Sequence, residues 1–407
     1  MTASAVSGVP MGTRLRTLRG LAGYRCGHTG SCCRAGWPIP VEAAPLAVLH
    51  RAAAGGRLPP TPDPWLVDDR ILGHTQDNDC SFLDRTALAA SRGGCRIEQT
   101  LGTEGLPFSC RQFPRVLLAD GRGWHATLSA WCGTAAALLT APVDNSESFL
   151  AYDHIDVDHR VHVEFLDARG AWPPFLRPGV LAGLAAYDAW EARVLEQFLA
   201  PVGCRTHRMT EALWALLQWT EWVRGWSSHD GDLTVRVLRP WAARTGHVVH
   251  IVNAVTTLDV LLQDLISRVP AEWRPAAWPE GLTDTQAKGG PLNRNHADEV
   301  LARYMATRLV GSWVAYQGQG LRSVLASLIV SHALVVRALS AAGQPVTLGR
   351  MTSAIRAADW LSLHLLDRDV WAAYCSSFEG TDGATRLASL VRAAGTAADG
   401  LQWSLEP

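Results

Sequence analysis

The chain has 407 residues and a formal net charge of −1, which is enough length for about two or three domains with a substantial core. Apolar residues make up 48% and charged residues 18% of the chain, so a disordered protein is excluded, and the near-neutral charge offers no basic field for nucleic acid. The N-terminal stretch MTASAVSGVPMGTRLRTLRG lacks the apolar run of a secretory signal. We therefore expect a folded cytoplasmic protein whose thiols stay reduced.

Cysteines are concentrated in the first third of the chain. Adjacent Cys32 and Cys33 suit a disulfide poorly, because the short ring is strained, and reduced thiols favour metal binding. Cys204 and Cys375 stand alone in the remainder, and we interpret them as buried packing residues. The candidate metal ligands are Cys26, Cys32, Cys33, Cys80, Cys95, Cys110 and Cys132.

Glycine and proline interrupt this cysteine-rich third, in GWPIP, LPPTPDPW, SRGG and LPFS, which predicts loops and short helices around a metal core. The expected fold class is mainly α, with a loop-rich N-terminal cysteine-cluster metal domain followed by an α-helical domain. The expected organisation is a tail at 1–22, the cysteine-cluster domain at 23–141, a polar linker at 142–177, the helical domain at 178–395 and a tail at 396–407.

Apolar residues recur at three- and four-residue spacing from Pro178 onward, as amphipathic helices require. The sequence shows no alternation of short strands and helices, which a doubly wound sheet would require. The segment from Leu321 to Leu339 is the most apolar, but it carries Arg322, His332 and Arg337, so we expect no uninterrupted membrane span. Helices are predicted over 179–200, 209–226, 233–269 with a break at Pro240, 297–316, 321–342 and 348–376.

The expected linker contains the charged stretch YDHIDVDHRVHVEF. Imidazoles and carboxylates can bind metals, but their spacing here fits no single helix face, and charge runs usually face water. We interpret the stretch as a solvated bridge. Its imidazoles and carboxylates are those of Asp153, His154, Asp156, Asp158, His159, His162 and Glu164.

The spacing of the cysteines leaves two kinds of metal centre open. Thiolates select zinc, or iron with inorganic sulfide. A zinc site commonly uses two close pairs of ligands, whereas Cys80, Cys95 and Cys110 stand singly. Iron–sulfur clusters take cysteines from separated segments, although the Cys-x3-Cys-x2-Cys spacing of radical enzymes is absent. Two metal sites, or one cluster with spare redox cysteines, are both compatible with the sequence.

The order CGHTGSCC, CSFLD, GCRIE, LGTEGLPFSCRQFPR and LSAWC, from about Tyr24 to Leu139, resembles the cysteine-cluster family described as zinc- or iron-chelating. The phrases CCRAGWPIPVE and LG…LP..CR.FPR resemble more narrowly its flagellin lysine-N-methylase branch, and DEVLARYMATRLVGSW is similar to a helix of that branch. The resemblance implies an iron–sulfur enzyme that uses S-adenosylmethionine to methylate lysine in a protein substrate, flagellin-like or other. It also favours the interpretation of Arg111 and Arg115 as cofactor-binding residues over the alternative that they are surface arginines on a loop.

The chain departs from the family pattern at two positions. Thr29 stands where the family has its second cysteine, and Gly133 stands where proline is usual. His28, beside Thr29, is either a substitute nitrogen ligand or a loop histidine facing solvent. The glycine turns GGPLNRN, GTDGATR and ADGRGW lack the frame of a nucleotide loop, and no nucleophile motif identifies catalytic residues. The alternative function is a non-catalytic metal-binding or redox-sensing module with a helical partner surface.

Overall fold

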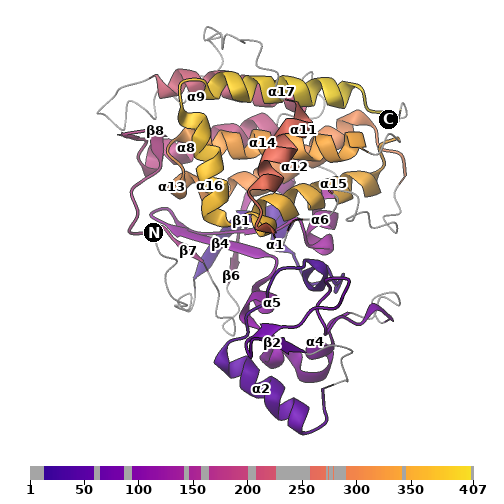
Figure 1. Ribbon diagram of the computed structural model, residues 1–407. Helices are drawn as coiled ribbons and strands as arrows, with labels where there is room; N and C mark the ends of the chain where they lie inside the picture. Colours follow the sequence, from indigo (N-terminus) through magenta and orange to yellow (C-terminus); the bar gives the residue numbers. More distant parts are fainter. Residues whose placement is uncertain are drawn as a thin grey trace.

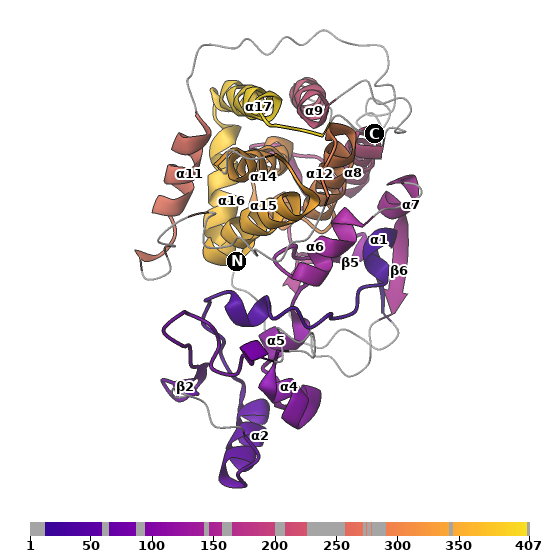
Figure 2. The ribbon, with the colours of Figure 1, turned by 90° about the vertical axis from the view of Figure 1, so that its right-hand side faces the viewer.

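The protein consists of a helical body and a smaller N-terminal part, which lie one above the other in Figures 1 and 2. The prediction of a mainly helical protein is confirmed, although some β-sheet is present. Cys204 and residues 157–164 of the charged stretch lie outside the described residues. The computed structural model describes residues 13–58, 65–86, 94–141, 146–156, 165–199, 208–225, 257–271, 274, 278, 290–341 and 345–404.

Short helices and a two-stranded sheet form the smaller part, which surrounds a small apolar cluster. Ile39, Leu49, Phe82 and Ile97 are buried in this cluster. Its elements are η1 (Cys32–Arg34), α2 (Ala43–Ala54), β2 (Leu66–Val67), β3 (Ile71–Leu72), α4 (Arg96–Leu101), η2 (Gly102–Gly105) and α5 (Phe108–Gln112).

A mixed five-stranded sheet, in the order β6-β1-β5-β4-β7, lies where the two parts meet (Figure 1). β4 and β5 form a hairpin, β1 runs parallel to β5 and antiparallel to β6, and β4 runs parallel to β7. α1 (Arg19–Ala22), α6 (Gly133–Thr140) and α7 (Ser146–Leu150) lie beside it (Figure 2). Its strands are β1 (Arg14–Leu18), β4 (Arg115–Asp120), β5 (Gly123–Leu128), β6 (Tyr152–Asp156) and β7 (Leu166–Asp167).

This sheet was not predicted. β1 lies within the expected N-terminal tail, and β6 and β7 lie within the expected linker. Part of the stretch interpreted as a solvated bridge is therefore an edge strand, because all five residues of β6 pair with β1. The sheet escaped prediction because β1 pairs with β5, far along the chain. Leu15 and Leu18 of β1 are buried in that folded arrangement.

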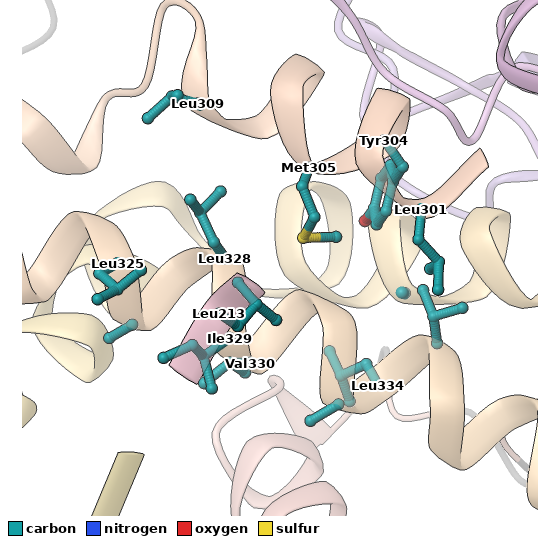
Figure 3. Close-up of a cluster of buried hydrophobic side chains, with 14 of the residues drawn as sticks. Leu213, Leu301, Tyr304, Met305, Leu309, Leu325, Leu328, Ile329, Val330 and Leu334 are labelled. Atoms are coloured by element: carbon teal, nitrogen blue, oxygen red, sulfur yellow. The ribbon is translucent and has the colours of Figure 1, made fainter. Parts of the chain in front are cut away.

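The helical body is built around α14 (Leu321–Ala341), with the other helices packed on its sides (Figure 1). Figure 3 shows Leu301, Tyr304 and Met305 of α12 near Leu328 and Ile329 of α14. The surrounding elements are α8 (Leu184–Leu199), α9 (Met209–Arg224), α11 (Leu258–Ser267), α12 (Arg294–Leu309), α13 (Val314–Gln317), α15 (Leu348–Trp360), α16 (Arg368–Ser376) and α17 (Gly383–Asp399).

Several helix boundaries differ from those predicted. α8 begins five residues late, since the hairpin of β8 (Phe175–Arg177) and β9 (Val180–Leu181) precedes it. The run over 297–316 divides where Gly311 adopts a left-handed φ of 69°. The run over 348–376 divides at the π-helical turn η7 (Leu361–Leu365). Helix α17 was not predicted, since it follows the last predicted run, and it reaches into the expected C-terminal tail.

By length and composition, α14 is the one helix among the described residues that is apolar enough to cross a membrane. Most of its surface is buried against other helices of the body, as in the core helix of a folded domain.

The burial of His332 on α14 predicts a specific pH dependence. His332 is 2% exposed, and burial, reinforced by Arg294, lowers its pKa to about 4. Because an unfolded histidine has a pKa near 6.5, the unfolded state binds a proton between these values and the folded state does not. Stability is therefore lost as the pH falls from about 6.5 toward 4.

We expect the free energy of unfolding of the native protein to fall by roughly 2 kcal/mol more between pH 7 and pH 5 than that of His332→Leu. Urea denaturation at the two pH values measures this difference. An equal loss in the two proteins would contradict it.

Candidate functional site

Glycines shape the loop that carries Cys32 and Cys33. Gly30 adopts a left-handed φ of 70°, and its carbonyl accepts a hydrogen bond from the Cys33 amide at 3.1 Å. Gly36 has a φ of 74°, and a side chain there would meet Asn78 Nδ2 at 2.5 Å. These positions favour glycine, so the loop can turn tightly on both sides of the adjacent cysteines.

Separate segments bring further thiols to this loop. The Cys80 amide donates to the Cys33 carbonyl at 2.7 Å. Cys95 pairs with Leu83 in an isolated β-bridge and directly precedes α4. Cys110 lies within α5. Backbone hydrogen bonding thus places Cys80 beside Cys33, and the bridge to Leu83, three residues after Cys80, brings Cys95 to the same region.

Five thiols gather in the apolar cluster of the N-terminal part. Cys33 and Cys80 are buried in it, and Cys32, Cys95 and Cys110 pack against it. The Sγ atoms of Cys32 and Cys33 are 3.9 Å apart, far beyond the bond length of a disulfide. The eight cysteines that the structure describes are all free thiols. Five of the seven predicted ligands are therefore neighbours in space.

The thiols influence one another's ionisation. Interactions with Cys32, Cys80 and Cys95 raise the pKa of Cys33 well above that of an ordinary thiol. Hydrogen bonds from Cys33 lower the pKa of Cys32 and of Cys95. Burial, followed by the charges of Cys32, Cys80 and Cys95, raises the pKa of Cys110. Since close thiolates repel one another, the group gains negative charge more easily when a cation joins it.

Cys26 and Cys132 form a second, smaller group around Tyr24. The Tyr24 hydroxyl lies 3.5 Å from Cys132 Sγ, and burial together with this thiol raises the pKa of Tyr24. Cys26 is exposed, and its sulfur accepts the His28 amide at 3.4 Å. Burial of the thiol raises the pKa of Cys26, and the charges of Cys32, Glu98 and Cys132 add to the shift. Neither of these two predicted ligands belongs to the apolar cluster that holds the other five.

His28 and Thr29 of the CGHTGSCC loop have polar partners. The His28 Nδ1 atom lies 3.2 Å from Glu98 Oε2, and both side chains are partly exposed. The hydroxyl groups of Thr29 and Ser31 are 2.9 Å apart. The imidazole of His28 is therefore engaged by a carboxylate.

The predicted cofactor arginines occupy different surroundings. The Arg115 guanidinium lies over the Tyr24 ring, 5.3 Å from its centroid, and so belongs to the smaller thiol group. Arg111 follows Cys110 on α5, and its Nε atom is buried without a hydrogen-bond partner. Each arginine lies near one group of thiols.

Among the described residues, no group of three or more His, Cys, Asp or Glu side chains is placed so that it could hold a metal ion. The thiols are neighbours in one apolar cluster. Their chemistry nevertheless fits a metal centre, because a group of sulfur donors only is the set that zinc or iron–sulfur clusters select.

Sequence reasoning missed the polar network that joins the cysteine loop to the helical body. Ser129 Oγ lies 2.7 Å from Asp359 Oδ2 and 2.7 Å from His364 Nε2. The His364 ring contacts the Trp37 ring, with centroids 4.5 Å apart. Burial raises the pKa of Asp359 and lowers the pKa of His364 to about 3. Because Ser129 donates to the carboxylate, the imidazole does not activate it as a nucleophile.

A second set of bonds fixes the same loop. Arg356 donates to Ser31 Oγ at 3.2 Å and to the Trp131 carbonyl at 3.1 Å. Trp131 Nε1 donates to the Ser31 carbonyl, and Trp360 Nε1 donates to the Ala35 carbonyl at 3.0 Å. α15 thereby holds both ends of the segment that carries Cys32 and Cys33.

No protein-family model, no curated protein and no solved structure matches this chain.

Replacing Arg356 with Met should loosen the cysteine loop. A hydrogen bond to a charged group contributes roughly 1.5–3 kcal/mol, so amide exchange at residues 31–37 should accelerate by about 10- to 100-fold. Hydrogen exchange with mass spectrometry measures this change, with Arg392→Met, at an exposed position on α17, as the control. Unchanged exchange of residues 31–37 in Arg356→Met would show that Arg356 does not anchor the loop.

Proposed function

We propose that the protein holds a metal centre on thiolates of its N-terminal part, in the form of an iron–sulfur cluster, with zinc as the alternative. The observation that supports this is the gathering of five thiols from four separated segments into one apolar cluster. A set of lone packing cysteines would not require this proximity, and a close thiol pair resists a second ionisation in the absence of a cation. The proposed ligands come from Cys32, Cys33, Cys80, Cys95 and Cys110.

The metal would also stabilise the N-terminal part, which we propose to be a loop-rich metal domain. Its apolar cluster is much smaller than the core of the helical body, and four of its short segments carry the thiols. Small domains with such cores commonly depend on a bound metal, since metal binding supplies folding free energy.

On the resemblance of its cysteine phrases, we propose that the activity is S-adenosylmethionine-dependent N-methylation of lysine in a protein substrate, within the cytoplasm. Arg115 beside Tyr24 and Cys132, and Arg111 beside Cys110, are the cationic groups near the thiols that could meet a cofactor carboxylate. In this proposal Cys26 and Cys132 serve the cofactor region rather than the main thiol cluster.

The metal proposal predicts different effects for different cysteines. In protein purified without oxygen, Cys33→Ser should lose most of its metal and acid-labile sulfide, because Cys33 contacts three other thiols. Cys26→Ser should keep most of its metal, because Cys26 is exposed and lies outside the apolar cluster of the five thiols. Elemental and sulfide analysis measures both quantities.

Cys375→Ser is the matched control, since Cys375 is a fully buried cysteine in the core of the helical body. Equal metal content in Cys33→Ser and Cys375→Ser, with both proteins folded, would refute the proposed centre. Calorimetry with S-adenosylmethionine then separates the two candidate functions. Metal without adenosylmethionine binding would support a redox or structural module instead of a methylase.

A further inference from the structure

A small cavity in the helical body, away from the cysteines, carries the features of a ligand site. It encloses about 40 Å³ between the C-terminal end of α12, α13, the turn η7, α16 and the hairpin β4–β5. α13 and α16 lie side by side above β4 in Figure 1. A water molecule needs about 10–15 Å³, so the space suits a few waters or a group the size of a carboxylate.

Polar side chains around this cavity have unsatisfied atoms. Arg308 Nε, Trp313 Nε1 and Arg368 Nε are buried donors without a hydrogen-bond partner, and Gln317 Oε1 is a buried acceptor without one. All four residues line the cavity. Buried polar groups in folded proteins are nearly always paired, so several unpaired donors at one cavity point to a group that is not part of the chain.

Arginine charge also converges on the cavity. Arg308 is more than nine-tenths buried and lies 3.4 Å from Asp359, so its charge is largely balanced. The Arg368 guanidinium lies over the Trp313 ring, 5.0 Å from its centroid. Its nearest carboxylate, Asp369 at 3.7 Å, is largely exposed to water and balances it only weakly.

The rest of the lining is apolar and includes Val116, Val310, Leu363 and Trp371. An apolar pocket with a few convergent polar groups is the usual form of a small-molecule site, and guanidinium groups are suited to carboxylates. We propose that this cavity binds the carboxylate of a small organic acid with a short apolar chain, with Arg368 and Trp313 as donors. This proposal does not depend on the proposed metal centre.

Propanoate is the probe, because it carries a carboxylate on a short apolar chain. Ligand-observed NMR and calorimetry should detect its binding to the native protein. We expect Arg368→Gln to weaken binding by about tenfold or more, through loss of a charge-assisted donor, and Trp313→Phe to weaken it less, since the ring is kept. If Arg368→Gln fails to fold, the weaker binding expected of Trp313→Phe provides the test.

Arg337→Gln is the matched control. Arg337 and Arg368 have side chains 25% and 24% exposed, and each pairs with an aspartate that is mainly in water, but Arg337 does not line the cavity. Its variant should bind propanoate as the native protein does. Equal weakening in Arg337→Gln and Arg368→Gln, or no binding of propanoate to the native protein, would overturn the proposal.

Two further compounds test the chemical class. 1-Propanol has the same chain without the charge, and inorganic phosphate has charge without the chain. Neither should displace propanoate. Displacement by 1-propanol would mean that only the apolar walls bind, and displacement by phosphate at lower concentration than propanoate would mean that the site is not selective for carboxylates.

Discussion

The thiol of Cys33 lies among the thiols of Cys32, Cys80 and Cys95 inside an apolar cluster, and this proximity constrains the whole N-terminal part. Close thiolates cannot all carry charge unless a cation compensates them. The backbone around them is correspondingly fixed, by the left-handed glycines of the loop and by the hydrogen bond from the Cys80 amide to the Cys33 carbonyl. On the account proposed above, a metal centre is the group that this arrangement accommodates.

The helical body provides the rigid support for this arrangement. Its core around α14 is extensive, and α15 together with the turn η7 projects Arg356, Trp360 and His364 against the cysteine loop. Asp359, buried beneath the loop, accepts a hydrogen bond from Ser129 and lies near Arg308, which also lines the carboxylate-sized cavity. The loop and the cavity are thus attached to the same stretch of the body.

Sequence patterns predicted the features that depend on local periodicity or on composition. The spacing of apolar residues predicted α9 and α14 nearly to the residue, and the concentration of cysteines predicted that thiols would gather. The five-stranded sheet was missed because β1 is short and pairs with β5 and β6, more than a hundred residues away. The division of the thiols into a group of five and the pair Cys26 and Cys132 was also missed, because sequence spacing does not show which loops bring their cysteines together in space. The polar network of Ser129, Asp359 and His364 was missed as well, because these three residues form no recognisable sequence motif.

X-ray absorption at the edge of the bound metal, on protein purified without oxygen, tests the central claim most directly. It measures which atoms surround the metal. The proposed centre predicts a first shell of sulfur only, because the gathered side chains of the five-thiol group are all cysteines. A first shell dominated by nitrogen or oxygen atoms, or the absence of any tightly bound metal, would contradict it.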